Sequence, residues 1–124
     1  MIGEIRKIIT SFYDLKNNKM SFKSRPALII AKADKKDYVV LPISTITRKD
    51  NLVLEYDIEI EPTKYPKLNL QKISYVRTHK QTIIHSAEIG DFIGDMKNNY
   101  EELFLEILEK REKFSKSITN QALE

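Results

Sequence analysis

Apolar and polar residues alternate in short runs over most of the chain and recur at helical spacing near its end. Apolar, β-branched runs separated by polar breaks predict strands at Glu4–Tyr13, Pro26–Ala33, Tyr38–Ile43, Leu52–Ile60, Leu68–Val76 and Thr82–His85. The isoleucines of the first run also fit helical spacing, so a helix is the alternative there. From Asp91 onward, apolar side chains recur every three or four residues, which predicts an amphipathic helix capped by Asp91 or Asp95.

The segments between these runs are polar. Asp14–Ser24 is expected to be a mobile loop, Asp34–Asp37 a hairpin turn, and Ser44–Asn51 and Glu61–Lys67 connectors. Within Leu52–Ile60, alternation places Asp57 on the polar outer face with Glu55 and Glu59. The pattern as a whole predicts a mainly β (α+β) fold, a small β-barrel or strongly bent sheet with a long C-terminal α-helix. We expect a single domain over residues 1–124, with a tail that frays from about residue 115.

Composition narrows the chemistry. The 124 residues include no cysteine, which excludes disulfides, thiolate catalysis and zinc-thiolate sites. The two isolated histidines, His79 and His85, do not form a metal cluster, so neither a metal nor a cofactor is expected. No run approaches the ~18 apolar residues of a membrane span, and no secretory leader is apparent, so the cytoplasm is the expected compartment.

The charge is distributed unevenly. Residues 1–80 carry 16 Lys or Arg and 9 Asp or Glu, whereas residues 81–124 carry 5 and 9. The densest basic stretch, Lys16–Lys36, holds seven cations and one anion. Such a field attracts polyanions, although a solvated loop face is the alternative.

An arginine stands where this basic stretch enters an apolar strand. Pro26 favours extended geometry for Arg25, the residue before it, which is expected to project a fixed positive charge from a strand end.

Four segments together resemble the PemK/MazF (Kid-like) toxin family of type II toxin–antitoxin systems. They are Gly3-Glu4-Ile5, Lys23-Ser24-Arg25-Pro26-Ala27-Leu28-Ile29-Ile30, Val39-Val40-Leu41-Pro42-Ile43-Ser44-Thr45 and Ser74-Tyr75-Val76-Arg77-Thr78, with Ile89-Gly90 before the final helix. The resemblance implies an SH3-like barrel with a C-terminal helix, in a homodimer. It also implies a metal-independent endoribonuclease that cleaves single-stranded RNA to 2′,3′-cyclic phosphate and 5′-hydroxyl ends and is restrained by a cognate antitoxin.

The resemblance also designates catalytic residues. Cleavage through the ribose 2′-OH needs a base, an acid and charge stabilisation at the phosphate. Arg25 is expected to stabilise the phosphate, the alternative being a surface ion pair with Asp14 or Asp34. Ser44 or Thr45 corresponds to a family hydroxyl that binds the phosphate, or else ends the strand in an ST-turn. Arg77 either holds phosphate or pairs across a dimer.

His79 follows two residues after Arg77, where some relatives carry an acid. A histidine there is a competent acid or base, the alternative being an exposed residue beside Lys80. The family's Gly- and Gln-containing loop is replaced by residues 15–22, which contain no glycine. We expect RNA to contact Lys19, Ser21, Phe22, Lys23 and Arg48. Met20 and Phe22 either stack on bases or cover a dimer seam.

Two other functions fit the same sequence. A barrel with an altered loop can bind nucleic acid without cleaving it, and related toxins on this fold act on a protein target such as a topoisomerase. Salt-dependent RNA binding without cleavage favours the first, and RNA cleavage by the purified chain excludes the second as the main activity.

Overall fold

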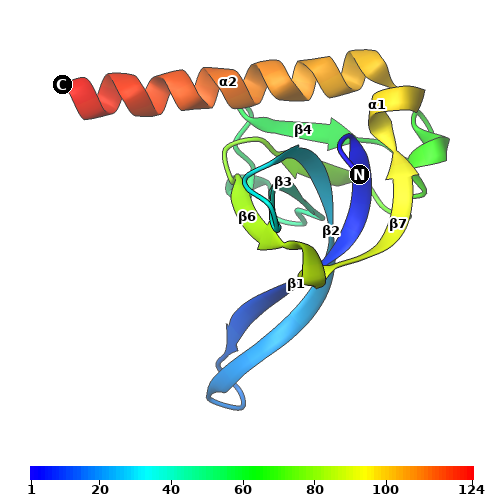
Figure 1. The fold of residues 1–124 in the computed structure, drawn as a ribbon, viewed down its shortest axis with the longest axis vertical. Coiled ribbons are helices and arrows are strands. Elements are labelled where there is room, and N and C mark those ends of the chain that lie inside the picture. Colours follow the sequence, from blue (N-terminus) through cyan, green and yellow to red (C-terminus); the bar gives the residue numbers. More distant parts are fainter.

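The computed structural model describes residues 1–124 and shows a curled antiparallel sheet with a long helix across one end (Figure 1). The strands are β1 (Glu4–Asp14), β2 (Lys19–Lys32), β3 (Asp37–Ser44), β4 (Asp57–Ile60), β5 (Ser74–Arg77), β6 (Thr82–His85) and β7 (Ile89–Asp95). The α-helices are α1 (Met96–Asn99) and α2 (Glu101–Leu123). Short 3-10 turns lie at Lys49–Asn51, Pro66–Leu68 and Ser86–Glu88.

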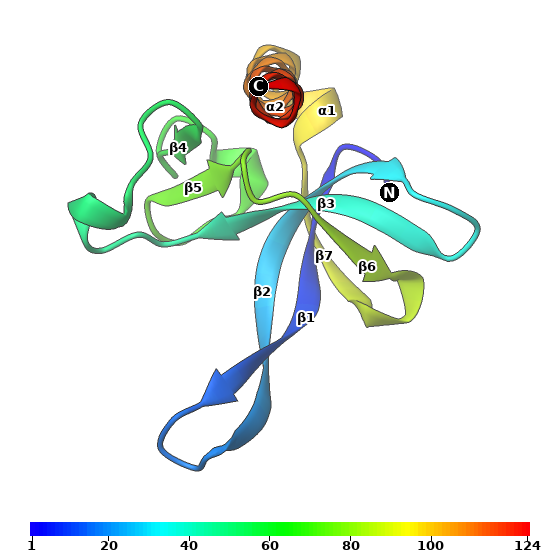
Figure 2. The same ribbon diagram turned by 90° about the vertical axis from the view of Figure 1, so that its left-hand side faces the viewer.

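Strand β3 is the centre around which the sheet curls. The strand order is β4-β5-β3-β2-β1-β7, and β6 pairs with the first half of β3. Because β3 pairs with β6 at one end and with β5 at the other, the sheet bends into a half-barrel (Figure 2). The predicted small SH3-like β-barrel with a C-terminal helix is confirmed.

Two apolar clusters lie on opposite faces of this sheet. The larger one joins the sheet to α2 through Leu103, Phe104 and Ile107 and includes Met96 of α1. The smaller cluster comprises Ile8, Ala27, Ile29, Val40 and Ile84. Side chains alternate between faces along a strand, so the candidate residues on β2, β3 and β5 can be assigned to one cluster's face or the other's.

The expected mobile loop over Asp14–Ser24 is wrong, because most of it is strand. Strands β1 and β2 stay paired out to Asp14 opposite Lys19 and form a hairpin that projects away from α2 (Figure 1). Only residues 15–18 form the turn. The Asp14 carboxylate accepts hydrogen bonds from the backbone N–H groups of Lys16 and Asn17, and Asn18 adopts a left-handed φ of 53°. The paired residues beyond the barrel, 9–14 and 19–25, are called the arm below.

Two predicted strands are shorter in the structure. Leu52 is irregular and residues 53–56 form a turn rather than the first half of a strand, because the backbone N–H groups of Tyr56 and Asp57 both donate to the Val53 carbonyl. Leu68 ends a 3-10 turn, and Asn69 follows in the left-handed region with φ 56°. Strand β5 therefore begins at Ser74.

The last helix begins later than its apolar spacing predicts. Residues 89–95 pair with β1 as the edge strand β7, so Ile93 lies in a strand. Asp95 then caps α1 by accepting from the Asn98 N–H at 3.1 Å, as predicted. Helix α2 continues to Leu123, through the segment from about residue 115 where the sequence predicts fraying. Neither helix is long and apolar enough to cross a membrane.

Candidate active site

An open hollow of about 550 Å³ lies where β3 and β5 end. Its wall is lined by Ser44, Thr45, Ile46, Thr47, Asn51, Val53, Arg77, His79 and Lys80. Four of the five predicted catalytic side chains, Ser44, Thr45, Arg77 and His79, thus come together from strand ends far apart in the sequence. Hydroxyl groups, cations and an imidazole are the side chains that bind and protonate a phosphodiester.

A buried carboxylate holds the arginine of the hollow. Asp57 and Arg77 are cross-strand partners in the β4–β5 register. Arg77 Nε donates to Asp57 Oδ1 at 3.1 Å, and Arg77 Nη2 donates to Asp57 Oδ2 at 3.4 Å and to the Asn51 carbonyl at 3.1 Å. The Asp57 side chain is fully buried and that of Arg77 is 20% exposed. The guanidinium is therefore fixed at the edge of the hollow rather than free to follow a ligand.

Asp57 was assigned by alternation to the solvated face of a strand, and that assignment is wrong. Asp57 does lie on the face of β4 that is opposite to that of the core residue Ile58. The turn formed by residues 53–56 and the side chain of Arg77 nevertheless cover it. Only the pairing of β4 with β5 reveals this contact, and no local feature of the sequence encodes it.

His79 is a buried histidine rather than an exposed one. Its side chain is 10% exposed, and neither ring nitrogen has a hydrogen-bond partner. The ring stacks on Tyr56, with centroids 5.7 Å apart, and meets the edge of Phe114 of α2 at 6.1 Å. Burial lowers the pKa of His79 below its usual 6.5, with Arg77 and Lys80 acting in the same direction and Asp57 opposing them. A neutral imidazole at pH 7 is a proton acceptor, which favours a base over an acid.

Arg25 lies on the same face of the sheet as the hollow but not in its wall. Its cross-strand partner is Ile8 of the smaller cluster. The β2–β3 register runs to Ala27 opposite Pro42, and Arg25 and Ser44 each lie two residues beyond that pair. Ser44 is in turn the partner of Tyr75, two residues before Arg77. Because residues two apart on a strand share a face, Arg25, Ser44 and Arg77 lie on one face of three adjacent strands.

Arg25 also differs from the other arginines in having no ion pair. Of the five arginines, Arg6, Arg48, Arg77 and Arg111 each pair with a carboxylate, whereas Arg25 is exposed and unpaired. The alternative that Arg25 pairs with Asp14 or Asp34 is thus wrong. Its charge is available to a ligand.

The arm has two chemically distinct faces. Lys19, Ser21 and Lys23 share a face with Arg25, and Lys23 Nζ lies 4.6 Å above the Phe12 ring. The opposite face is apolar and exposed. It carries Ile9, Tyr13, Met20 and Phe22, whose exposed fractions run from 47% to 72%, together with Ser11 and Ser24. Of the RNA-binding side chains expected on the arm, Phe22 alone points away from the basic face.

Arg48 lies on the loop that borders the hollow, exposed and 3.4 Å from Asp50. Lys80 is exposed in the wall of the hollow and was not among the predicted residues. No three His, Asp or Glu side chains of residues 1–124 come together as a metal site.

The fold and the hollow define a small half-barrel protein with a hydroxyl-lined cationic site. The family model described as "PemK-like, MazF-like toxin of type II toxin-antitoxin system" matches residues 8–110, and the chain belongs to that family. Membership places it among toxins whose partner is an antitoxin.

Solved structures agree with the fold. Mycobacterium tuberculosis toxin MazF-mt6 is 19% identical, with a TM-score of 0.59 over 89% of this chain and 96% of that one. An endoribonuclease in complex with its cognate antitoxin, from a mycobacterial species, is 16% identical, with a TM-score of 0.62 over 92% of each chain. An Mtb toxin is 20% identical, with a TM-score of 0.54 over 73% of this chain and 91% of that one. Comparison with the curated proteins finds no match.

Proposed function

We propose that this chain is a toxin endoribonuclease that cleaves single-stranded RNA, without a metal ion, to 2′,3′-cyclic phosphate and 5′-hydroxyl ends. The observation that carries the proposal is the placement of Arg25, Ser44 and Arg77 on one face of three adjacent strands, in a member of a toxin family. The unpaired charge of Arg25 is the second support, because a phosphate needs a cation that is not already neutralised.

The roles follow from the environments of the side chains. Both ring nitrogens of His79 are buried, so we propose that the neutral imidazole turns toward the hollow when RNA binds and accepts the 2′-OH proton as the 2′-oxygen attacks phosphorus. Arg25 stabilises the charge that develops on the phosphoryl oxygens, and Arg77 presents a second, immobile guanidinium. Ser44 or Thr45 donates a hydrogen bond to the same phosphate. The P–O5′ bond breaks, and the leaving oxygen takes its proton from Lys80 or from water. The reaction needs no co-reactant, because the new P–O2′ bond replaces the P–O5′ bond and the proton lost by the 2′-OH is matched by the one gained at O5′.

The arm is proposed to guide RNA to the hollow. Lys19, Lys23 and Arg25 lie on one side of it, and Ser21 lies between the two lysines, so a backbone can follow this face toward Ser44. Arg48 borders the same route. The apolar opposite face of the arm, with Phe22, is proposed to contact a protein, either a second copy in a homodimer or an antitoxin segment. The cytoplasm is the proposed site of action.

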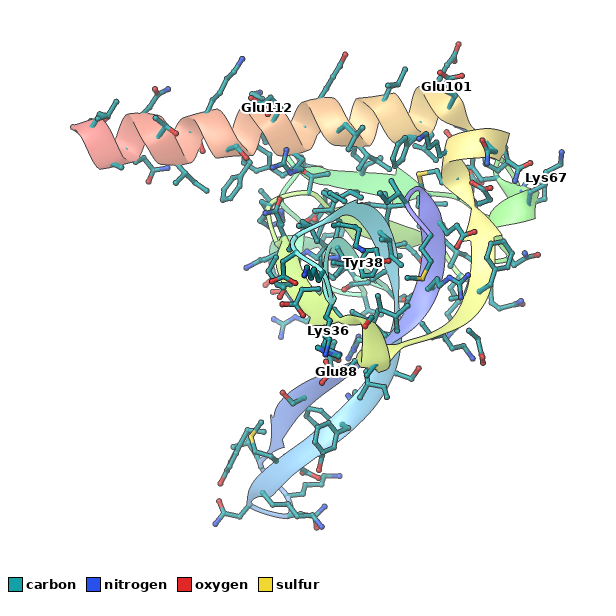
Figure 3. All side chains as sticks on the ribbon, in the orientation of Figure 1. Lys36, Tyr38, Lys67, Glu88, Glu101 and Glu112 are labelled. Carbon is teal, nitrogen blue, oxygen red and sulfur yellow. The ribbon has the colours of Figure 1, made fainter.

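The test is RNA cleavage by the purified protein in EDTA, with analysis of the ends. Cyclic phosphate and 5′-hydroxyl ends are expected, and Arg25→Ala is expected to lower the cleavage rate about 100-fold. Lys67→Ala is the charge-matched control, because Lys67 is exposed on the Pro66–Leu68 turn, where its backbone N–H donates to the Tyr100 hydroxyl, and lies outside the hollow (Figure 3). Loss of all cleavage in EDTA, or full activity of Arg25→Ala, contradicts the mechanism. Salt-dependent binding without cleavage supports a non-catalytic module instead.

A further inference from the structure

One carboxylate lies against two of the three ionisable side chains of the hollow, Arg77 and His79. Asp57 accepts from Arg77 Nε at 3.1 Å, and its Oδ1 atom also lies 3.8 Å from His79 Nδ1. The side chain of Asp57 is fully buried. Such burial is costly for an anion unless each oxygen finds donors, and here Arg77 and the Val53 N–H, at 2.8 Å, supply them.

We propose that Asp57 is a positioning residue of this site, whose carboxylate fixes the guanidinium of Arg77 and orients the imidazole of His79. The assignment rests on the proposed endoribonuclease function. Asp57 itself does not reach the RNA, because its side chain is buried behind Arg77 and is not in the wall of the hollow.

The imidazole is where the carboxylate matters most. At 3.8 Å the Asp57–His79 contact is longer than a hydrogen bond, so both ring nitrogens are left without a partner in a buried position. An anion on the Nδ1 side favours the tautomer with its proton on Nδ1. The carboxylate therefore selects the protonation and orientation of an imidazole that no hydrogen bond fixes.

Two contacts hold the residue before Asp57 against the residues that follow Arg77. The hydroxyl of Thr78, the residue between Arg77 and His79, donates to the Tyr56 carbonyl at 2.7 Å. Tyr56 also stacks on His79. The segment that carries Asp57 is thus bound to the segment that carries both of its partners.

The charges around His79 are few. Asp57 and Arg77 face it from β4 and β5, Lys80 follows it in the chain, and Arg111 of α2 lines a smaller hollow on its other side. Asp57 is the one anion among them. Removing it is expected to lower the pKa of His79 further, because burial, Arg77 and Lys80 then act without opposition.

Asp57→Asn is the test, since asparagine keeps the shape and removes the charge. Glu59→Gln is the matched control, a carboxylate two residues along the same strand but exposed. Two readouts are needed: RNA cleavage, resolved into kcat and KM, and NMR titration of His79 with His85 as the internal reference. For Asp57→Asn we expect kcat to fall at least about tenfold with little change in KM, and the His79 midpoint to move down. Asp57→Glu is expected to restore part of both.

The outcomes separate the two proposals. If the parent cleaves RNA and Asp57→Asn cleaves equally fast with an unchanged His79 midpoint, the Asp57 proposal is overturned. A fall in kcat without a shift of His79 assigns Asp57 a purely structural role and also overturns it. If the parent protein does not cleave RNA, the proposed function fails, while the titration still tests whether Asp57 acts on His79. Where Asp57→Asn does not fold, Asp57→Glu, which displaces the carboxylate but leaves Arg77 and His79 in place, takes its place in the same two measurements, and an unchanged His79 midpoint with unchanged kcat overturns the proposal.

Discussion

The basic face of the arm lies on the same side of the sheet as the hollow, but the cations of the two regions differ in how they are held. On the arm, Arg25 is exposed and unpaired, and the ammonium of the exposed Lys23 lies above the Phe12 ring without a salt bridge. In the hollow, Arg77 is fixed by two Asp57 oxygens and a backbone carbonyl. The arm can therefore attract and follow a polyanion, whereas the hollow offers a rigid arrangement that no longer has to be ordered when a ligand arrives.

The two regions also differ in what they contribute to the fold. Ion pairs that include a fully buried partner are costly to break, whereas exposed, unpaired cations contribute little. This difference predicts that substitutions in the hollow lower both stability and activity, and that substitutions on the arm lower activity alone.

Arg77→Ala is expected to produce the largest effect. It leaves the Asp57 carboxylate buried without its cation, which costs about 3 kcal/mol in the free energy of unfolding. Arg25→Ala, the same chemical change on the arm, is expected to alter that free energy by less than about 0.5 kcal/mol. Urea unfolding of the two variants measures the difference. Equal destabilisation by both would remove the contrast between the two regions.

The sequence predicts the outline of both regions but not their contacts. Strand β1 and the pairing of β2 with β3 follow from apolar alternation, which depends on local pattern alone. The first strand of the arm lies within the predicted strand Glu4–Tyr13, but its second strand, residues 19–24, was predicted to be loop. That strand extends beyond the barrel, where neither face is buried in the core, so its polar residues resemble a loop. The turn between the two strands is encoded locally, in Asp14 and Asn18.

The candidate site likewise contains residues that the sequence predicts and contacts that it does not. Arg25, Ser44 and Arg77 are predicted because each stands in a motif that resembles the family. Asp57 was missed because its role arises only when β4 pairs with β5, a tertiary contact that the spacing of residues does not report. The burial of His79 was missed for the same reason, since Phe114 reaches it from 35 positions further along the chain.

The double variant Lys19→Ala/Lys23→Ala sharpens the description of the arm. Each cation that contacts a single-stranded phosphate contributes about 0.7 to the slope of log Kobs against log salt, so the slope is expected to fall by about 1.4. Binding of a labelled RNA over a range of salt concentrations measures it. The control is Lys35→Ala/Lys36→Ala, which removes two cations from the β2–β3 turn, near Glu88 (Figure 3). An equal change of slope from both pairs would show that only net charge matters.

Phe114→Ala tests the burial of the imidazole in the hollow. The loss of this ring admits water to His79, so the pKa of His79 is expected to rise toward 6.5. NMR titration measures the rise, and Leu105→Ala, an exposed residue of α2 that does not line the hollow beside His79, is the control.

The same lowered pKa makes stability depend on pH with a definite sign. Because the folded protein holds the His79 proton less tightly than the unfolded chain does, its contribution is complete above about pH 6.5 and is lost as the pH falls toward the folded-state pKa. Urea unfolding at about pH 7.5 and about pH 5.5 is expected to show this loss in the parent and a smaller loss in Phe114→Ala. An unchanged His79 midpoint in Phe114→Ala would mean that the Phe114 ring does not exclude water from His79.

Asp14→Ala is expected to have the smallest effect and to be confined to the arm. The Asp14 carboxylate accepts from the Asn17 side chain at 2.8 Å and from two backbone N–H groups of the turn, and these hydrogen bonds, the Asn17 side chain first, lower its pKa. Asp34 makes the equivalent contacts to Lys36 and Asp37 in the β2–β3 turn, so Asp34→Ala is the matched control. Hydrogen exchange of the arm amides should quicken in Asp14→Ala but not in Asp34→Ala, with the thermal midpoint of both unchanged.

Because the folded pKa of Asp14 is lowered, acid should produce the same loosening in the parent as the pH falls below about 3.8. If Asp14→Ala instead lowered the global midpoint, the arm would be part of the cooperative core, and a free cationic arm beside a fixed hollow would no longer describe the molecule.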